Sequence, residues 1–171
     1  MGSISSTMIL AILPEILLLV LGGLVLILDA VWSDEKRRNL GWVVAGGLVL
    51  TLFLSLVLAS PGGTNELLWG GMIRHDWIGF IFKMLFIFGA AITALFAMDI
   101  DALGKRGEFY LLLLVSTIGM NLMATSADLI MLYLAIETTS IPMYILAGFF
   151  KTDEKSTEAG FKYLLFGEIG R

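Results

Sequence analysis

Five long apolar runs, each close to the length of a membrane crossing, constrain this chain more than any other feature. A bilayer core of about 30 Å requires about 20 helical residues. The runs cover residues 8–31, 40–59, 77–98, 109–127 and 129–150. Strands of a membrane barrel would alternate polar and apolar residues, and these runs do not. The sequence therefore predicts an all-α, polytopic transmembrane helix bundle with five full spans, followed by the start of a sixth at residues 159–167.

Composition excludes most other classes of protein. Hydrophobic residues make up 58% of the chain and charged residues 15%, whereas a soluble domain has about 25% charged residues. The chain has no cysteine and one histidine, His75, so the sequence predicts neither a disulfide nor a zinc site. It contains no nucleotide-binding loop or nucleophile triad, and no basic block suited to nucleic acid. Any chemistry is expected to be ion translocation or to belong to partner chains.

The loop charges predict an orientation. Seven Lys and Arg residues lie in the joints after the first, third and fifth runs, and the opposite joints hold only Arg74. Cationic loops stay on the cytoplasmic side of a membrane. The amino terminus is therefore expected outside the cell and the end of the fifth span inside.

Glu137 is the residue most suggestive of function, because it stands near the middle of the fifth run. An ionisable residue at that depth costs at least about 2.5 kcal/mol and usually faces the bundle interior. Tyr133, Ser140 and Tyr144 share its helical face by their spacing. Pro142 lacks an N–H and is expected to kink or open the helix near this carboxyl. Two interpretations stay open: Glu137 handles a proton or ion, or it pairs with a lysine to hold two helices together.

A weaker polar stripe runs along the fourth span. Thr117, Asn121, Thr125 and Asp128 recur every three or four residues. They could face the polar stripe of the fifth span across a tight hairpin, where hydrogen bonds between helices are the favoured interpretation.

Four charged residues near span ends have simpler expected roles. Lys83 is expected to extend its ammonium to the outer interface, and Glu15, following Pro14, is expected to stabilise the positive end of a helix dipole. Asp29 lies near the negative end of the same helix and should seek a basic partner in the joint that follows. Lys162, considered alone, is typical of an interface anchor.

Three segments together carry a resemblance to a known family. They are Leu13–Val31, which begins LPEI and ends LDAV; Gly107–Gly167, which begins GEFY; and within it Glu158–Gly167, EAGFKYLLFG. In this order they resemble the antiporter-like, proton-translocating membrane subunits of respiratory complex I (NADH-quinone oxidoreductase), and most closely subunit N. The family combines inverted helical repeats with broken helices and holds no redox centre.

The resemblance implies roles for individual residues and a setting for the chain. Glu137 corresponds to the family's functional glutamate of the fifth helix, which interacts with a lysine on a later helix, and Lys162 corresponds to the lysine near the start of the sixth. These two are the expected proton-transfer (catalytic) residues. The residues already grouped with Glu137 by spacing are expected to support them: Tyr133, Ser140, Tyr144 and Pro142. No cofactor or metal is expected on this chain, and NADH and quinone are used by the whole complex. The expected partners are other membrane subunits, in a hetero-oligomer, and the lipid bilayer of the bacterial inner membrane, with no nucleic acid.

The resemblance also divides the chain. Residues 1–106 correspond to an amino-terminal three-helix membrane segment, and residues 107–171 to the truncated start of the first antiporter-like repeat. The chain is expected to represent the amino-terminal third of a family member, inactive in isolation. Two alternatives stay open: a subunit of a multi-subunit cation/proton antiporter, and a non-catalytic truncated membrane fragment.

Overall fold

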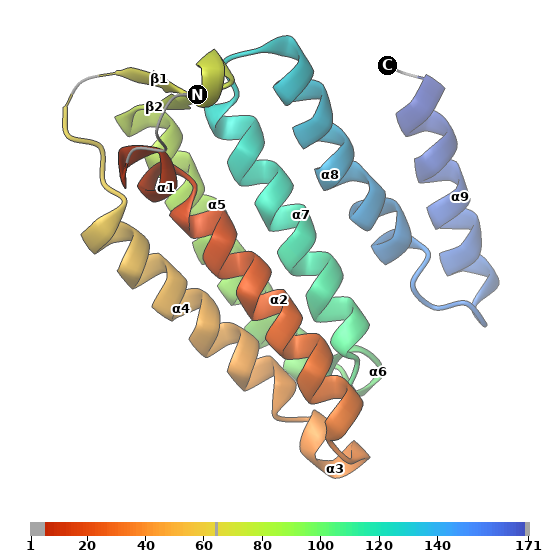
Figure 1. Ribbon diagram of the computed structural model, residues 1–171. Coiled ribbons are helices and arrows are strands. Elements are labelled where there is room, and N and C mark those ends of the chain that lie inside the picture. The colour runs from red at the N-terminus through yellow and green to blue at the C-terminus, as the bar shows by residue number, and fades with distance from the viewer. Residues whose placement is uncertain (1–5, 64, 170–171) are drawn as a thin grey trace.

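The computed structural model describes residues 6–63 and 65–169 and consists mainly of an antiparallel helix bundle (Figure 1). Five of its helices are long and apolar enough to cross a membrane, which confirms the predicted class. They are α2 (Leu13–Val31), α4 (Leu40–Leu58), α5 (Trp77–Met98), α7 (Gly107–Thr125) and α8 (Leu129–Ala147).

The first span is shorter than predicted, because the run 8–31 is not one helix. A separate short helix, α1 (Ser6–Ala11), comes first, and Ile12 then leaves the helical conformation with φ −108° and ψ 11°. Pro14 lies in the first turn of α2, where a residue without an N–H breaks no hydrogen bond and its fixed φ suits a helix start. The chain therefore turns just before Pro14 instead of continuing straight.

Helix α7 lies at the centre of the bundle. It packs against α2, α5 and α8, and α4 closes the other side of α2 and α5. The apolar core between these helices includes Leu18, Val25, Leu48, Ile87 and Leu114. Consecutive long helices run in opposite directions, so each loop lies at the opposite end of the bundle from the one before it (Figure 1).

The most extensive helix contact joins α7 and α8, which confirms the tight hairpin predicted for the fourth and fifth spans. Gly119 allows the two backbones to meet, since a Cβ there would lie 2.6 Å from the backbone nitrogen of Thr139. Asp128 caps α8 by accepting a hydrogen bond from the Ile130 N–H at 3.2 Å.

A small β-hairpin, absent from the sequence prediction, covers one end of the bundle. Its strands β1 (Glu66–Leu68) and β2 (Ile73–His75) pair antiparallel around the short helix η1 (Trp69–Gly71). Gly70 and Gly71 have φ values of 70° and 89°, a left-handed conformation that favours glycine. The Ala127 N–H donates to the Met72 carbonyl at 2.8 Å, so the hairpin is tied to the α7–α8 turn.

The opposite end of the bundle holds the cationic joints. The short helices α3 (Asp34–Arg37) and α6 (Asp101–Gly104) lie there, and α9 (Glu154–Ile169) begins there and runs back beside α8 (Figure 1). The structure thus separates these joints from the β-hairpin, which carries Arg74. We call the hairpin end the outer end and the cationic end the inner end, following the charge-based prediction of orientation.

Candidate functional site

The predicted polar face of α8 is only partly covered. Tyr133 is exposed, Glu137 and Ser140 are half-buried, and Tyr144 is buried. Helix α8 is the least buried of the five spans, with 17% of its apolar window enclosed. Glu137 therefore lies on a helix that offers a large surface to lipid or to further protein.

The sequence predicts that Pro142 kinks or opens its helix, and the structure shows that α8 is not opened there. The helix continues without a break from Leu129 to Ala147. In the turn before the proline, three side-chain hydroxyls donate to carbonyls four residues back, at 2.8–2.9 Å: those of Thr138, Thr139 and Ser140. These hydroxyls bond to the carbonyls of Leu134, Ala135 and Ile136, whereas the carbonyl that Pro142 leaves without its N–H donor is that of Thr138.

Lys162 stands on α9, next to α8 but at its surface. Its ammonium is exposed and forms an ion pair with Glu158, one turn earlier on the same helix. Helix α9 meets α8 through the rings of Tyr163 and Tyr144, whose centroids are 4.9 Å apart. The structure thus places Glu137 and Lys162 on neighbouring helices, with the lysine directed to its own helix.

The polar stripe of the fourth span is buried, but its hydroxyls bond within α7 rather than to α8 as expected. Thr117 donates to the Leu113 carbonyl at 2.7 Å, and Thr125 to the Asn121 carbonyl at 3.2 Å. The Asn121 side chain is fully buried, and neither its oxygen nor its nitrogen has a hydrogen-bond partner among the described residues. Buried amides without partners are rare and point to a functional or strained position.

The structure reveals a buried ion pair that the sequence analysis missed. The Lys83 ammonium of α5 lies 2.8 Å from a Glu15 carboxylate oxygen of α2, and these side chains are 3% and 8% exposed. The ammonium also donates to the Ala11 carbonyl at 2.9 Å. The sequence-based roles of both residues are therefore corrected. Lys83 does not extend to the interface, and Glu15, although in the first turn of α2, directs its carboxylate to α5.

Depth along the spans is the signal that could have found this pair. Both helices start at the outer end, where Glu15 is the third residue of α2 and Lys83 is the seventh residue of α5. The difference of four residues amounts to about 6 Å along a helix. A long side chain that points back toward its helix N-terminus can span that distance. An acid and a base at such depths are candidates for pairing wherever their helices are neighbours.

Several polar residues lie next to Lys83 at the outer end of the bundle. Lys83 borders a small cavity together with His75, Asp76 and Thr125. Asp76 caps α5 through the Gly79 N–H at 2.8 Å and pairs with the half-exposed Arg74 at 2.8 Å. Burial lowers the pKa of His75 below its ordinary 6.5, and the charge of Lys83 lowers it further, while Glu66 and Asp76 oppose the shift. His75 is therefore mostly neutral at neutral pH.

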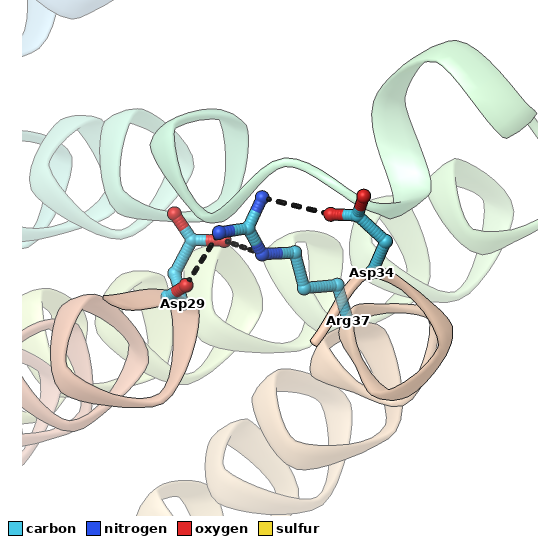
Figure 2. A network of polar contacts seen from close by, with 3 residues as sticks. All are labelled: Asp29, Asp34 and Arg37. Carbon is cyan, nitrogen blue, oxygen red and sulfur yellow. Dashed lines mark hydrogen bonds and ion pairs between the residues drawn. The ribbon is translucent and has the colours of Figure 1, made fainter. Parts of the chain in front are cut away.

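A second network holds the inner end together, and it confirms the prediction that Asp29 finds a basic partner in the next joint. Figure 2 shows Arg37 between Asp29 and Asp34. Its guanidinium lies 3.4 Å from the Asp29 carboxylate and 3.3 Å from that of Asp34, and it donates to the Asp29 carbonyl at 2.9 Å. The cation thus stands at the negative end of the α2 dipole, where it stabilises the helix.

Replacement of this cation should have a modest effect. We expect Arg37→Met to lower the free energy of unfolding by about 1 kcal/mol, because Asp29 would lose its partner at a helix C-terminus. The measurement is an unfolding titration of the purified chain in mixed micelles. The neighbouring exposed Arg38 provides the control, Arg38→Met. Equal stability of the two variants would show that the network contributes nothing.

Comparisons with known proteins give consistent results. Residues 126–171 match the family model described as NADH:quinone oxidoreductase/Mrp antiporter, transmembrane. The chain is 36% identical to NADH-quinone oxidoreductase subunit N 1 of Roseiflexus castenholzii, over 92% of this chain and 35% of the relative. It is also 36% identical to subunit N of a Geobacillus species, over 91% of this chain and 32% of the relative. The chain thus spans about a third of the length of these relatives.

A solved structure agrees. The fold matches a chain of respiratory complex I from Thermus thermophilus, with a TM-score of 0.71 and 28% sequence identity, over 91% of this chain and 33% of that one. The long apolar helices define a multi-pass membrane protein, and residues 126–171 match the antiporter-like family model. Within that class, the chain is similar to NADH-quinone oxidoreductase subunit N over about a third of that subunit's length.

Proposed function

We propose that this chain serves as part of a proton-translocating membrane subunit of a bacterial NADH-quinone oxidoreductase. It would act with the other membrane subunits of that complex in the cell's inner membrane. The identity to subunit N along nearly the whole chain is the observation that carries this proposal. Oxidation of NADH and reduction of quinone are assigned to other subunits, and this chain is assigned no cofactor of its own.

Glu137 is proposed as the proton carrier of this segment, with Lys162, on the neighbouring helix α9, as a second proton-transfer residue. The carboxylate of Glu137 takes a proton from a neighbouring acid or water, whose bond to hydrogen breaks as the new O–H bond forms, and it releases the proton to the next base when a cation approaches. Its half-buried place on the least covered span supports this role, because further protein packed on α8 would remove water from the carboxylate. The face that carries Glu137 extends toward both ends of the helix through Tyr133, Ser140 and Tyr144. Pro142 has no backbone N–H, so it removes one hydrogen bond of α8.

Neutralising Glu137 tests the proposal. In the complete complex, we expect Glu137→Gln to lower proton pumping about tenfold or more, since the amide keeps the shape of the side chain but binds no proton. Pumping is measured in closed vesicles beside NADH oxidation. Glu35→Gln, an exposed glutamate of α3, is the matched control. Unchanged pumping and unchanged oxidation in Glu137→Gln would contradict the proposal.

A second candidate function follows from the family model, whose description includes the Mrp antiporter. In that case the chain would belong to a multi-subunit cation/proton antiporter. The two functions differ in their energy source, so sodium-dependent proton movement in the absence of NADH would favour the antiporter. Proton movement that requires NADH oxidation would favour the first proposal.

A further inference from the structure

The Glu15–Lys83 pair has features that a purely structural ion pair does not need. Both side chains are more than nine-tenths buried inside membrane-spanning helices. The carboxylate faces the Lys83 ammonium, yet neither of its oxygens has a hydrogen bond of good geometry among the described residues. A carboxylate has about four acceptor positions. Burial of a poorly satisfied pair is costly, and apolar residues of similar size are often as stable or more so. The pair therefore calls for an explanation beyond packing.

The pair connects toward the outer end of the bundle. Lys83 borders the small cavity that His75 and Asp76 also line, and Asp76 contacts the half-exposed Arg74. Thr125 lines this cavity too, one helical turn beyond Asn121, whose buried amide has no hydrogen-bond partner among the described residues. A row of polar groups thus leads from the buried pair to the β-hairpin.

On its other side, Glu15 borders an apolar groove of about 390 Å³ that reaches α7 and α8. Ile118 and Leu122 of α7 and Met131 of α8 form part of its wall. Met131 precedes Glu137 by six residues, which is about 9 Å along the helix. Glu15 therefore lies between the outer polar row and the helix that carries the proposed proton carrier.

We propose that Glu15 and Lys83 form a second proton-binding site, which exchanges protons with the outer end of the bundle through His75. This inference rests on the proposed function, and it adds an outward-facing site to it. The charged groups that act on this site come from several elements. Glu15 of α2 faces Lys83 of α5. The charges of Lys83, Glu66 and Asp76 act on His75.

The transfer balances in two steps. First, an N–H bond of the Lys83 ammonium breaks and an O–H bond forms on Glu15, which leaves a neutral amine and a neutral acid. Second, the amine takes a proton from the His75 imidazolium, so that Lys83 is charged again and His75 is neutral. One proton has moved from the outer end to Glu15, and the reverse steps return it. The cavity is too narrow for a water molecule, so the second step requires the Lys83 side chain to move toward His75.

The lowered pKa of His75 fits a carrier that passes a proton on rather than storing it. The cause is burial first, followed by the positive charge of Lys83. A proton bound by His75 from the outer solution is therefore released readily near neutral pH.

Lys83→Arg is the decisive variant. Arginine preserves the charge and can keep the ion pair, but it does not give up its proton in proteins. In the complete complex in oriented vesicles, we expect Lys83→Arg to lower proton pumping about tenfold. We also expect His75→Gln to flatten the dependence of pumping on outer pH below 6.5, the ordinary histidine pKa, because burial and Lys83 lower the pKa of His75. The control is Lys105→Arg, since Lys105 forms an exposed ion pair with Asp101 at the inner end.

Normal pumping by an assembled Lys83→Arg complex, with an unchanged pH profile in His75→Gln, would overturn the inference and leave a structural pair. If Lys83→Arg fails to assemble, the neutral double variant Glu15→Gln/Lys83→Met replaces it. This double variant must lower pumping relative to Asp101→Asn/Lys105→Met, and equal pumping overturns the inference. Glu137→Gln separates the two proposals. If it pumps normally, the proposed function fails; if it blocks pumping while the pair variants pump like their controls, only the second site fails.

Discussion

Lys83→Met is expected to destabilise the bundle by about 3–5 kcal/mol, because it leaves the Glu15 carboxylate buried without its cation. The ammonium lies 2.8 Å from that carboxylate, and the Glu15 side chain is 8% exposed. The substitution also removes the bond from the ammonium to the Ala11 carbonyl, which ties α1 to α5. An unfolding titration in mixed micelles measures the loss.

The double variant Glu15→Gln/Lys83→Met serves as the control for this prediction. It removes both charges together, and a neutral pair of similar size is often tolerated where a lone charge is not. We therefore expect it to recover most of the lost stability. If Lys83→Met were as stable as the unsubstituted protein, Glu15 would have to reach solvent or another cation, and the buried pair would be wrong. Equal stability of the single and double variants would show that the lone charge is not the cause.

The sequence was sufficient to predict the spans, because the length and apolar character of a run decide whether it crosses a membrane. Residues 77–98 form α5 with the predicted bounds. The start of α2 was missed because mean hydropathy does not register a backbone break, and the run continues through Ile12 without a charge. Here Pro14 was the better guide to the helix start.

Pairings across the bundle were harder to predict than spans. The Asp29–Arg37 contact was predictable because the two residues are close in the chain and a helix dipole favours a cation there. The Glu15–Lys83 pair joins helices far apart in sequence, so it depends on which helices are neighbours. Single-residue rules instead assigned these two residues to the interface and to a helix start. The outer β-hairpin was missed for a different reason: its strands have only three residues each, which is too short for an alternating pattern to be recognised.

The choice of Glu137 came from its central depth in a span, which is a property of the sequence alone. The described residues leave much of α8 exposed, so further protein packed on this helix would complete the surroundings of the carboxyl in an assembled complex. By contrast, Glu15 and Lys83, the two partners of the buried ion pair, both lie within the described residues. The function of Glu137 therefore stays a proposal to be tested in the complex, whereas the stability of the pair can be tested in the chain.

Gly119→Leu is expected to separate α7 from α8 and to cost about 3 kcal/mol of unfolding free energy. A Cβ at this position would lie 2.6 Å from the Thr139 nitrogen and 2.9 Å from the Thr138 carbonyl carbon. These are backbone atoms, so no side-chain rotation can relieve the contact and the helices must move apart. The α7–α8 contact is the largest in the bundle and holds the helix that carries Glu137.

Gly89→Leu on α5 is the matched control, since a Cβ there would meet no atom within 4 Å. It makes the same chemical change in another spanning helix, where leucine favours helix formation by about 0.8 kcal/mol over glycine. We therefore expect Gly89→Leu to be neutral or slightly stabilising in the same mixed-micelle titration, and Gly119→Leu to unfold at a lower denaturant fraction. Equal behaviour of the two variants would mean that α7 and α8 do not approach at Gly119. The α7–α8 hairpin that positions Glu137 beside the bundle would then lack the close backbone approach at Gly119.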